Sequence, residues 1–338
     1  MKNKSCMLVL SWLPFLGNLV EVKFHVVDSD GVPVANAMIE TSTSAEMISV
    51  WSNQSDKHKT IYTKTDENGQ ASCHFLCWRG SFDCYLEADD CYPEKKVNLS
   101  FATKSGDAFI ANLAGHEKEV NFKVYRKKSP VAMCVRPGGF RPIKCKAAIG
   151  VYEYDMEKCD YLPPYGHGEK CDMKVEWESV STNNTYECKG KVAFIDGGAY
   201  IMQKIPGSTP RSLQSVYRAD SNQTYKTEFS FYRRHRFNDK GWTQFGDGYI
   251  DIPVLKSSEY FVFRVRERRG ENGELIEAHY GKMYGVFHID ESRRLLFGQC
   301  SFNPNVNDNN LEVDTTKNLH HGPGGRESVE LRRAWLAP

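Results

Sequence analysis

The sequence predicts an all-β protein with two β-sandwich regions, and three observations support this prediction. Short segments throughout the chain alternate hydrophobic and polar residues with the two-residue period of half-buried strands. Clusters of glycine, proline, asparagine and aspartate separate these segments at the spacing typical of sandwiches. No segment has a convincing long helical pattern, and a length of 338 residues is typical of about two domains.

The composition excludes several classes of protein. Hydrophobic residues make up 40% and aromatic residues 12% of the chain, which is enough for packed cores and argues against wholesale disorder. The 44 basic and 43 acidic residues leave a net charge of +1. Because this balance supplies no general attraction to polyanions, we expect no nucleic-acid partner.

Residues 1–19 have the features of an export signal. Lys2 and Lys4 precede an apolar stretch from Cys6 to Leu16, which is the order of charge and hydrophobicity found in signal peptides. The stretch is too short to span a bilayer, and no other segment reaches spanning length. We therefore expect a secreted, periplasmic or cell-surface protein with no transmembrane segment in the mature chain. The alternative is an uncleaved apolar N-terminus.

The first region, residues 20–128, contains a series of short predicted strands. Asp28–Gly31 provides a turn after the first strand, and Asn68-Gly69 predicts a hairpin between the third and fourth. The predicted strands are residues 22–26, 33–39, 61–65, 71–75, 82–88, 95–101 and 120–125. Strands of this length and spacing predict a sandwich.

Three segments of this region resemble the carboxypeptidase-regulatory-like family. Residues 22–37 (VKFHVVDSDGVPVANA) match its opening strand, Asp/Gly turn and Pro-Val step. Residues 63–69 (TKTDENG) match its hairpin, and residues 80–88 followed by Cys91-Tyr92 match a later strand, with Cys91 in place of the family's glycine. The resemblance implies an extracellular, transthyretin-like and immunoglobulin-like sandwich that serves as a spacer, stabiliser or binding module. It implies no catalytic residues.

A charged segment with a following proline, residues 126–130, marks the boundary to the second region, residues 129–319. This region predicts a larger β-sandwich or jelly roll, with a hairpin at residues 270–273. Its predicted strands are residues 174–180, 191–195, 199–205, 227–232, 260–268, 283–290 and 295–302. Residues 320–338 begin with a glycine-rich breaker and predict a flexible tail. The order of regions is similar to that of uncharacterised exported bacterial proteins, which implies no function.

Ten cysteines follow the signal-like segment, and an even number in an exported chain predicts disulfides. Cys77 and Cys84 flank residues 79–82, a predicted hairpin loop that would place them opposite each other on paired strands. The alternatives are reduced core cysteines or a zinc site. The candidate disulfide cysteines are Cys73, Cys77, Cys84, Cys91, Cys159 and Cys171.

A search for catalytic motifs gives a negative result. The sequence has no nucleophile elbow, no zinc-protease motif, no phosphate-cradling loop and no dinucleotide-binding fingerprint. A carboxylate pair for glycoside hydrolysis leaves little local signature. Asp247, Asp251 and Glu259 are candidates for such a pair, but their positions are more typical of loops and strand edges. We therefore assign no catalytic residue.

Two basic and aromatic segments are candidate ligand-binding surfaces. Aromatic rings stack on sugars, and arginines hydrogen-bond hydroxyl groups and carboxylates. The alternative interpretation is an ordinary strand with an aromatic core face and a basic exposed face. The candidate residues are Tyr232, Arg234, Arg236, Trp242, Arg264 and Arg266.

Two loops are further candidates. The loop between Cys159 and Cys171 contains prolines, Tyr161 and Tyr165, and it predicts either a recognition surface or a stapled structural excursion. In segment 303–314, oxygen-bearing side chains at alternate positions suit Ca²⁺, although such segments usually form turns. The candidate calcium ligands are Asn303, Asn305, Asn307 and Asp308. No other cofactor is expected.

These observations predict an exported, non-enzymatic protein whose second region binds a carbohydrate or a surface partner, while the first region is a scaffold. One alternative is a structural or assembly subunit of a surface layer or complex. The other is a glycoside hydrolase or another secreted hydrolase. The sequence leaves the oligomeric state open.

Overall fold

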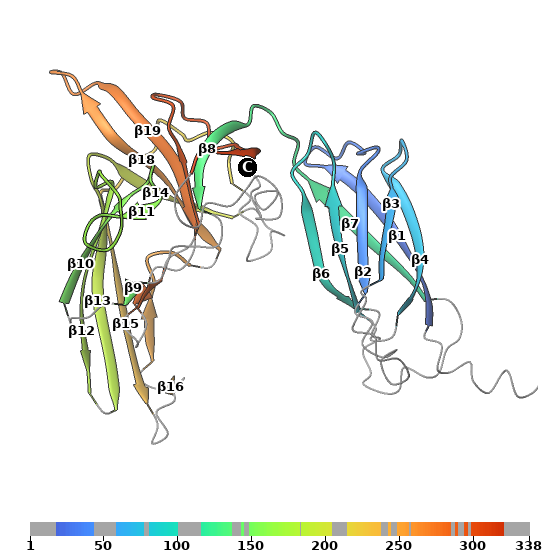
Figure 1. Cartoon of the computed structure of the whole chain (residues 1–338), viewed down its shortest axis with the longest axis horizontal. Helices are drawn as coiled ribbons and strands as arrows, with labels where there is room; N and C mark the ends of the chain where they lie inside the picture. Colours follow the sequence, from blue (N-terminus) through green and yellow to red (C-terminus); the bar gives the residue numbers. More distant parts are fainter. Residues whose placement is uncertain are drawn as a thin grey trace, which may run out of the picture. The chain divides into compact units, whose positions relative to one another are not determined.

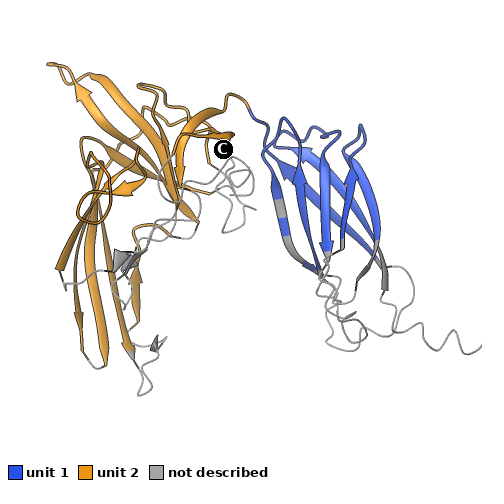
Figure 2. Cartoon of the chain, in the orientation of Figure 1, with its two compact units in different colours: residues 1–127 blue, residues 128–338 orange. Residues whose placement is uncertain are grey.

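The chain forms two compact units, residues 1–127 and residues 128–338, in the computed structural model (Figure 2). All regular elements among the described residues are strands, so the predicted all-β class is confirmed (Figure 1). The described residues contain no helix with the length and hydrophobicity needed to cross a membrane. The structure describes residues 18–43, 59–77, 81–100, 116–136, 143–144, 149–182, 184–204, 215–237, 243–244, 249–256, 258–284, 288–289, 294–296 and 299–320.

Unit 1 is a β-sandwich, as the sequence predicts. Its strands are β1 (Asn18–Asp28), β2 (Met38–Thr43), β3 (Lys59–Lys64), β4 (Gln70–Cys77), β5 (Ser81–Glu87), β6 (Glu94–Ser100) and β7 (His116–Val124). One sheet has the order β4-β1-β7 and the other β3-β2-β5-β6. Phe24, Leu86 and Phe122 are among the side chains that both sheets contribute to one hydrophobic core. β1 begins at Asn18, so the end of the signal-like segment 1–19 belongs to the sandwich, and residues 1–17 lie outside the described part.

The turn at residues 66–69 forms, but it is not the predicted hairpin. Asp66 Oδ1 accepts hydrogen bonds from the N–H groups of Asn68 (2.9 Å) and Gln70 (2.8 Å), and Gly69 has a φ of +70°. β3 nevertheless pairs with β2, whereas β4 pairs with β1 in the other sheet. The turn residues therefore encode the chain reversal without specifying which sheet the next strand joins.

The hairpin from which the disulfide between Cys77 and Cys84 was predicted does not form, for the same reason. β4 pairs Cys77 with Asn18, whereas β5 pairs Cys84 with Thr41 in the opposite sheet. The buried thiols of Cys84 and Cys73 lie 3.8 and 3.9 Å from the Thr41 hydroxyl. The disulfides predicted for Cys73, Cys91, Cys159 and Cys171 are likewise not formed. Free thiols are found at Cys73, Cys84, Cys91, Cys134, Cys159, Cys171, Cys188 and Cys300, all of them buried except Cys171.

Unit 2 is a larger β-sandwich. Its strands are β8 (Val131–Arg136), β9 (Ile143–Lys144), β10 (Ile149–Asp155), β11 (Asp160–Tyr161), β12 (Met173–Ser181), β13 (Thr185–Phe194), β14 (Gly198–Gln203), β15 (Glu228–Phe237), β16 (Thr243–Gln244), β17 (Ile250–Ile252), β18 (Glu259–Arg269), β19 (Leu275–Tyr284), β20 (His288–Ile289), β21 (Arg294–Leu296), β22 (Cys300–Asn303) and β23 (Val313–Asn318). One large sheet has the order β11-β10-β12-β13-β15-β16 with β17 also on β15, and the other has the order β14-β18-β19-β22-β8-β23. Trp177 and Phe231 of the first sheet share a core with Phe261 and Phe302 of the second.

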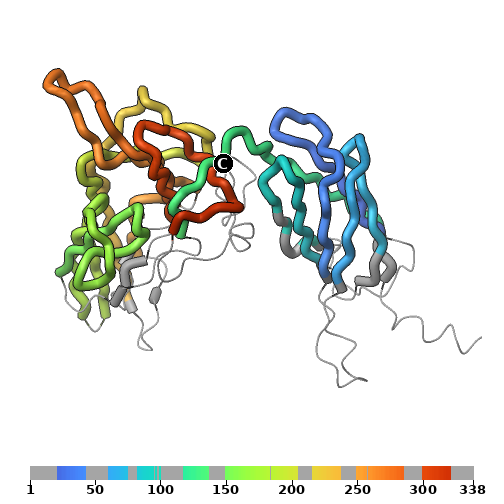
Figure 3. Tube along the Cα trace, turned by 45° about the horizontal axis from the view of Figure 1, so that its top comes forward, coloured from blue at the N-terminus to red at the C-terminus, as the bar shows by residue number. Residues whose placement is uncertain are grey.

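The last described strand of unit 2 lies beside its first. β23 pairs with β8 in parallel. Figure 3 draws β8 in green and β23 in red. β20, β21 and β9 form a third, smaller sheet. Residues 321–338 of the predicted tail lie outside the described part of the chain.

β18 changes the direction of its side chains at a β-bulge. Its register with β19 shifts between Val265 and Arg268, and Arg266 has a φ of +58°. The alternation that would place Arg266 on the same face as Arg264 therefore ends here. Both guanidinium groups lie largely buried, and Arg264, which precedes the bulge, is covered by contacts with Tyr225 and Glu267. The hairpin predicted at residues 270–273 is confirmed, since β18 and β19 pair antiparallel around it.

Candidate functional site

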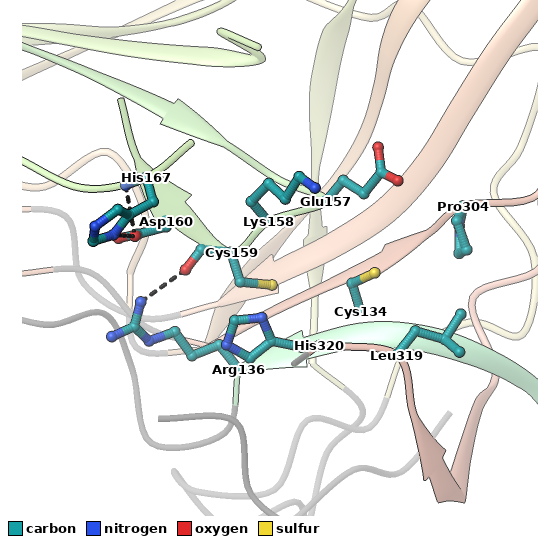
Figure 4. Close-up of a pocket in the computed structure, with 10 residues that line it drawn as sticks. All are labelled: Cys134, Arg136, Glu157, Lys158, Cys159, Asp160, His167, Pro304, Leu319 and His320. Atoms are coloured by element: carbon teal, nitrogen blue, oxygen red, sulfur yellow. Dashed lines mark hydrogen bonds and ion pairs between the residues drawn. The ribbon is translucent and has the colours of Figure 1, made fainter. Parts of the chain in front are cut away.

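A pocket of about 390 Å³ lies on unit 2. Its walls come from β8, from the loop that follows β10, from the residue after β22 and from the residues after β23 (Figure 4). The structure thus brings two loops singled out in the sequence, residues 159–171 and the Asn-rich segment, to one place. The lining residues are Cys134, Arg136, Glu157, Lys158, Cys159, Asp160, His167, Pro304, Leu319 and His320.

A buried carboxylate, not a disulfide, closes the loop of residues 155–172. Asp155 Oδ1 accepts hydrogen bonds from the N–H groups of Glu157 (3.0 Å) and Lys158 (3.1 Å). Its Oδ2 accepts hydrogen bonds from the N–H groups of Glu169 (2.9 Å) and Lys170 (3.0 Å). Because Asp155 is only 1% exposed, water does not compete for these bonds. One side chain therefore holds the two ends of the loop together.

Arg266 supplies the positive charge that the buried carboxylates require. Its Nε and Nη2 donate to the two oxygens of Asp172 at 2.8 and 2.9 Å, and Nη2 also donates to Asp155 at 3.0 Å. Nη1 donates to Glu157, and the guanidinium lies over the Phe302 ring. Bidentate pairs of this kind are among the strongest hydrogen-bonded contacts in proteins. The Glu157 carboxylate is therefore engaged by Arg266 and does not act as a free anion at the pocket.

Arg136 is a largely buried cation of the pocket. Because side chains two residues apart share a face of a strand, β8 presents Cys134 and Arg136 on the same side. Arg136 is 9% exposed, and its Nη1 donates to the Cys159 carbonyl at 2.7 Å (Figure 4). A guanidinium has five N–H donors, and Arg136 has no other hydrogen bond or ion pair within the described part of the chain. Donors thus remain available to a ligand.

The basic residues Lys158, His167 and His320 stand around Arg136 in the pocket wall (Figure 4). The nearby carboxylate of Asp160 is engaged, since its oxygens accept hydrogen bonds from the N–H groups of Tyr161 and His167, both at 2.9 Å. Lys158 lies 3.4 Å from Glu169, and His167 Nδ1 lies 3.5 Å from Asp160, so these two basic groups are themselves paired with carboxylates. The capacity of the pocket to hold an anion therefore depends mainly on the unused donors of Arg136. A planar carboxylate matches the fork of the Arg136 guanidinium best.

The two pocket thiols are not set up as nucleophiles. Burial raises the pKa of Cys134 to about 12 and raises the pKa of Cys159 well above its usual value. Both groups therefore stay protonated at neutral pH, and the thiolate is the reactive form. Within the described ranges, no three His, Cys, Asp or Glu side chains gather so that they could hold a metal ion.

The residues predicted on the two basic strands lie outside this pocket and are separated from each other. Tyr232, Arg234 and Arg236 share the outward face of β15, where the cross-strand partner of Arg234 is Glu187 of β13. Arg264 lies over the Tyr225 ring and donates to Glu267 at 2.6 Å. Arg264 and Arg266 are thus taken up by contacts inside unit 2. Trp242 lies outside the described residues.

Tyr161 and Tyr165 belong to the loop that lines the pocket, but neither forms its wall. Tyr161 is 2% exposed and packs edge-on against Tyr154, with 5.3 Å between the ring centroids. Tyr165 is 50% exposed and packs against Tyr152 at 4.8 Å. Of the two, only Tyr165 offers a ring to a partner.

The candidate calcium ligands take part in turns. Asn303 Oδ1 accepts a hydrogen bond from the Asn305 N–H (3.0 Å), and Asn307 Oδ1 accepts one from the Ala278 N–H (3.0 Å). The Asn303 side-chain amide donates to an Asp308 carboxylate oxygen at 3.0 Å. The bonds of Asn303 are those of the turn interpretation, whereas Asn307 connects the segment to β19. Calcium binding here stays a prediction, which a thermal-shift titration with calcium and EDTA tests.

Sequence reasoning missed Arg136 and Cys134 as site residues. Both lie on a strand whose pattern is that of any half-buried strand, and they reach the pocket only because β8 packs between β22 and β23. The one local signal is that Cys134 and Arg136 are two residues apart, so their side chains share one face of a strand. This arrangement is too common to predict a site.

No protein-family model and no curated protein sequence matches the chain. Three solved structures show a distant likeness: 3-chlorocatechol 1,2-dioxygenase from Rhodococcus opacus 1CP, the shaft pilin SpaA from Lactobacillus rhamnosus GG and the major pilin SpaD from Corynebacterium diphtheriae. Their identities are 15%, 10% and 8%, and their TM-scores are 0.24, 0.21 and 0.23. The likeness covers 33%, 81% and 87% of this chain and 61%, 89% and 83% of theirs, so the chain spans less than two thirds of the dioxygenase. At these TM-scores the likenesses carry no functional argument, and the carboxypeptidase-regulatory-like resemblance of unit 1 stays a prediction.

Proposed function

We propose that the chain is a non-enzymatic binding protein of the cell surface whose unit 2 binds an acidic carbohydrate in the pocket around Arg136. The observation that carries the proposal is a buried guanidinium with unused donors, surrounded by Lys158, His167 and His320. A carboxylate in this pocket would replace water at several donors at once, which favours affinity and fixes orientation. Export to the surface, inferred from residues 1–19, belongs to the same proposal.

The placement of the acidic residues supports a binder over a hydrolase. Asp251 lies on β17 and Glu259 on β18, which belong to different sheets, and Asp247 lies outside the described residues. The pocket carboxylates Glu157 and Asp160 accept hydrogen bonds from the chain itself. A glycosidase requires two carboxyl groups free to face one glycosidic bond. Neither pair meets that requirement.

An array of oligosaccharides with and without uronic acid groups tests the proposal. We expect saturable binding of the acidic members only, weakened by added salt. Arg136→Gln should raise the dissociation constant at least about tenfold, and Lys158→Ala by about two- to fivefold, because its exposed ammonium contributes less. Arg268→Ala, which removes an exposed arginine from the β18–β19 hairpin, is the matched control and should bind like wild type.

Three results, from this array and from a parallel array of acidic peptides, would decide against the acidic-carbohydrate assignment. Equal binding of neutral members, or unchanged binding by Arg136→Gln, would remove the role of the pocket. Binding of acidic peptides without binding of acidic sugars would keep the pocket and replace the ligand class. Circular dichroism of each variant confirms that a lost signal is not lost folding.

A further inference from the structure

Along its first residues, β10 has no partner strand on one side among the described strands. Its second neighbour, β11, pairs only with Tyr154 and Asp155 (Figure 1). The Tyr154 carbonyl accepts a hydrogen bond from Asp172 N–H on the β12 side, whereas the Glu153 carbonyl accepts one from Leu162 N–H on the opposite side, both at 2.9 Å. Backbone groups of alternate residues point to opposite sides of a strand. The N–H and C=O groups of Ile149 and Val151 therefore point away from β12, and no described strand pairs with them there.

The side chains along this edge are apolar and exposed. Ile149 is 69% and Val151 47% exposed, and Val180 on the neighbouring strand β12 is 64% exposed. Protein edges usually carry lysine, proline or a bulge at such positions, because a bare apolar edge pairs with other strands. Neither Ile149 nor Val151 provides this protection.

On the other face of the sheet, the position between Ile149 and Val151 is a glycine. A Cβ atom at Gly150 would lie 2.6 Å from Nε1 of Trp177, whose indole lies over this position. Only glycine fits without displacing the tryptophan, which is 3% exposed. A second strand can therefore approach at Gly150 without meeting a side chain from β10.

We propose that the β10 edge pairs with β10 of a second copy of this chain, antiparallel and about a two-fold axis at Gly150. In this register Ile149 of one copy lies opposite Val151 of the other, twice, and Gly150 lies opposite Gly150. Each Ile149–Val151 pair exchanges two N–H···O=C bonds, so the edge groups of both residues are satisfied in both copies. The two sheets join into one.

The choice of a second copy follows from self-complementarity. The two-fold axis places β-branched side chains against β-branched side chains on the exposed face, which is a favourable cross-strand combination. It places glycine against glycine at the non-hydrogen-bonded position, where strands approach most closely. On β12, Glu176 and Glu178 lie beside this edge, but Lys174, Lys189 and Lys191 form ion pairs with them. The two copies therefore do not meet as like charges.

The interface is small, so the association should be weak in solution and gain strength where many copies are held on one surface. The proposed dimer does not depend on the pocket around Arg136, so a negative result for either proposal does not bear on the other. Sedimentation velocity over a concentration series up to about 1 mM, a range suited to weak association, tests it with the full chain.

We expect the wild-type sedimentation coefficient to rise with concentration toward the dimer value. Val151→Pro removes an edge N–H that no strand within the described part of the chain uses, and it should weaken association at least about tenfold. Val151→Lys should do the same without changing the backbone. The control is Ile252→Lys, a 56% exposed residue on β17 at the other side of the same sheet, which should associate like wild type.

A wild-type chain that stays monomeric throughout the series overturns the proposal, and so does association that Val151→Pro leaves unchanged. The register has its own test. A mixture of Ile149→Cys and Val151→Cys chains should form mixed disulfide dimers under mild oxidation by oxidised glutathione, mapped by peptide mass spectrometry. If Ile149→Cys chains alone instead formed disulfide dimers through their introduced thiols more readily than the mixture, the two-fold axis at Gly150 would be contradicted.

Discussion

The two units of the chain differ most in what they bury. Among the described residues, the buried polar side chains of unit 1 are Asp28, Thr41 and Thr65, each of which serves a turn or the core contact between sheets. Unit 2 buries a much larger set, which includes Arg136, Asp155, Asp172, Arg264, His235, Lys282, Glu312 and His320. Burying charge is costly unless every group is paired.

This difference matches the proposed division between a scaffold in unit 1 and a binding site in unit 2. An apolar core whose few buried polar side chains form turn hydrogen bonds stabilises a fold but provides no charged group for a ligand. The buried charges of unit 2 instead hold a loop in position and leave Arg136 with donors to spare at a pocket. The comparison is consistent with the proposed binding role of unit 2, and the following experiments test the contrast between the two units.

Loss of a buried carboxylate should cost far more in unit 2 than in unit 1. Asp172→Ala leaves the guanidinium of Arg266 without its bidentate partner, and removal of one member of a buried pair costs about 3–5 kcal/mol. Asp28→Ala removes hydrogen bonds from Asp30 and Val32 and a contact with the half-exposed Arg126, and should cost about 1–2 kcal/mol. Urea unfolding followed by hydrogen exchange of peptides from each unit measures both. An equal or greater cost for Asp28→Ala would contradict the contrast between the cores.

The units should also respond to pH in opposite directions. Burial lowers the pKa of Lys282 to about 7, so between pH 7 and the ordinary lysine pKa the unfolded state binds more protons than the folded state. Unit 2 should therefore gain stability as the pH rises from 7 to 8.5, by at most about 1.4 kcal/mol per pH unit. Glu94 is only partly buried, but its desolvation raises the pKa of its carboxyl to about 7, so the folded state binds more protons between pH 4.5 and 7. Unit 1 should lose stability over that range.

The matched variants for this pH experiment are Lys282→Met and Glu94→Gln. Each should flatten the pH dependence of its own unit and leave the other unit unchanged, measured as urea midpoints at intervals of half a pH unit. A slope in unit 2 that survives Lys282→Met would show that other groups cause it.

The smallest expected effects concern two turn glycines. Gly273, with a φ of +85°, has nothing within 4 Å of an added Cβ atom, so Gly273→Ala in unit 2 should cost only the backbone penalty of about 1 kcal/mol. Gly69, with a φ of +70°, would place a Cβ atom 2.3 Å from the Val26 carbonyl oxygen, so Gly69→Ala in unit 1 should cost about 2 kcal/mol. Thermal unfolding of both variants measures the two losses of stability. A smaller loss for Gly69→Ala than for Gly273→Ala would contradict the prediction.

The same two turns show how far the sequence determines the fold. Both contain the glycines that a chain reversal requires, and both reversals form. Residues 270–273 join two strands of one sheet, whereas residues 66–69 join strands of facing sheets. The choice depends on which hydrophobic faces meet across the sandwich, and a local pattern does not record it. The wrong pairing of Cys77 with Cys84 on neighbouring strands has the same cause.

The candidate site was predictable in one part only. The loop of residues 159–171 stood out because two cysteines bracket it, and it does line the pocket, although Asp155 and not a disulfide holds it. Arg136 lies far from this loop in sequence and meets it through packing of β8. The bulge at Arg266 is likewise decided by distant partners, Asp155 and Asp172, which no alternation on β18 reveals.

The most direct test of the account is a calorimetric titration of the chain with a uronic-acid-bearing oligosaccharide and, separately, with its methyl ester. The ester keeps the sugar and removes the negative charge. The account predicts that wild type binds the acid at least about tenfold more tightly than the ester, and that Arg136→Gln abolishes this difference. Equal affinity for acid and ester in the wild type would contradict the claim that the pocket around Arg136 is an anion site.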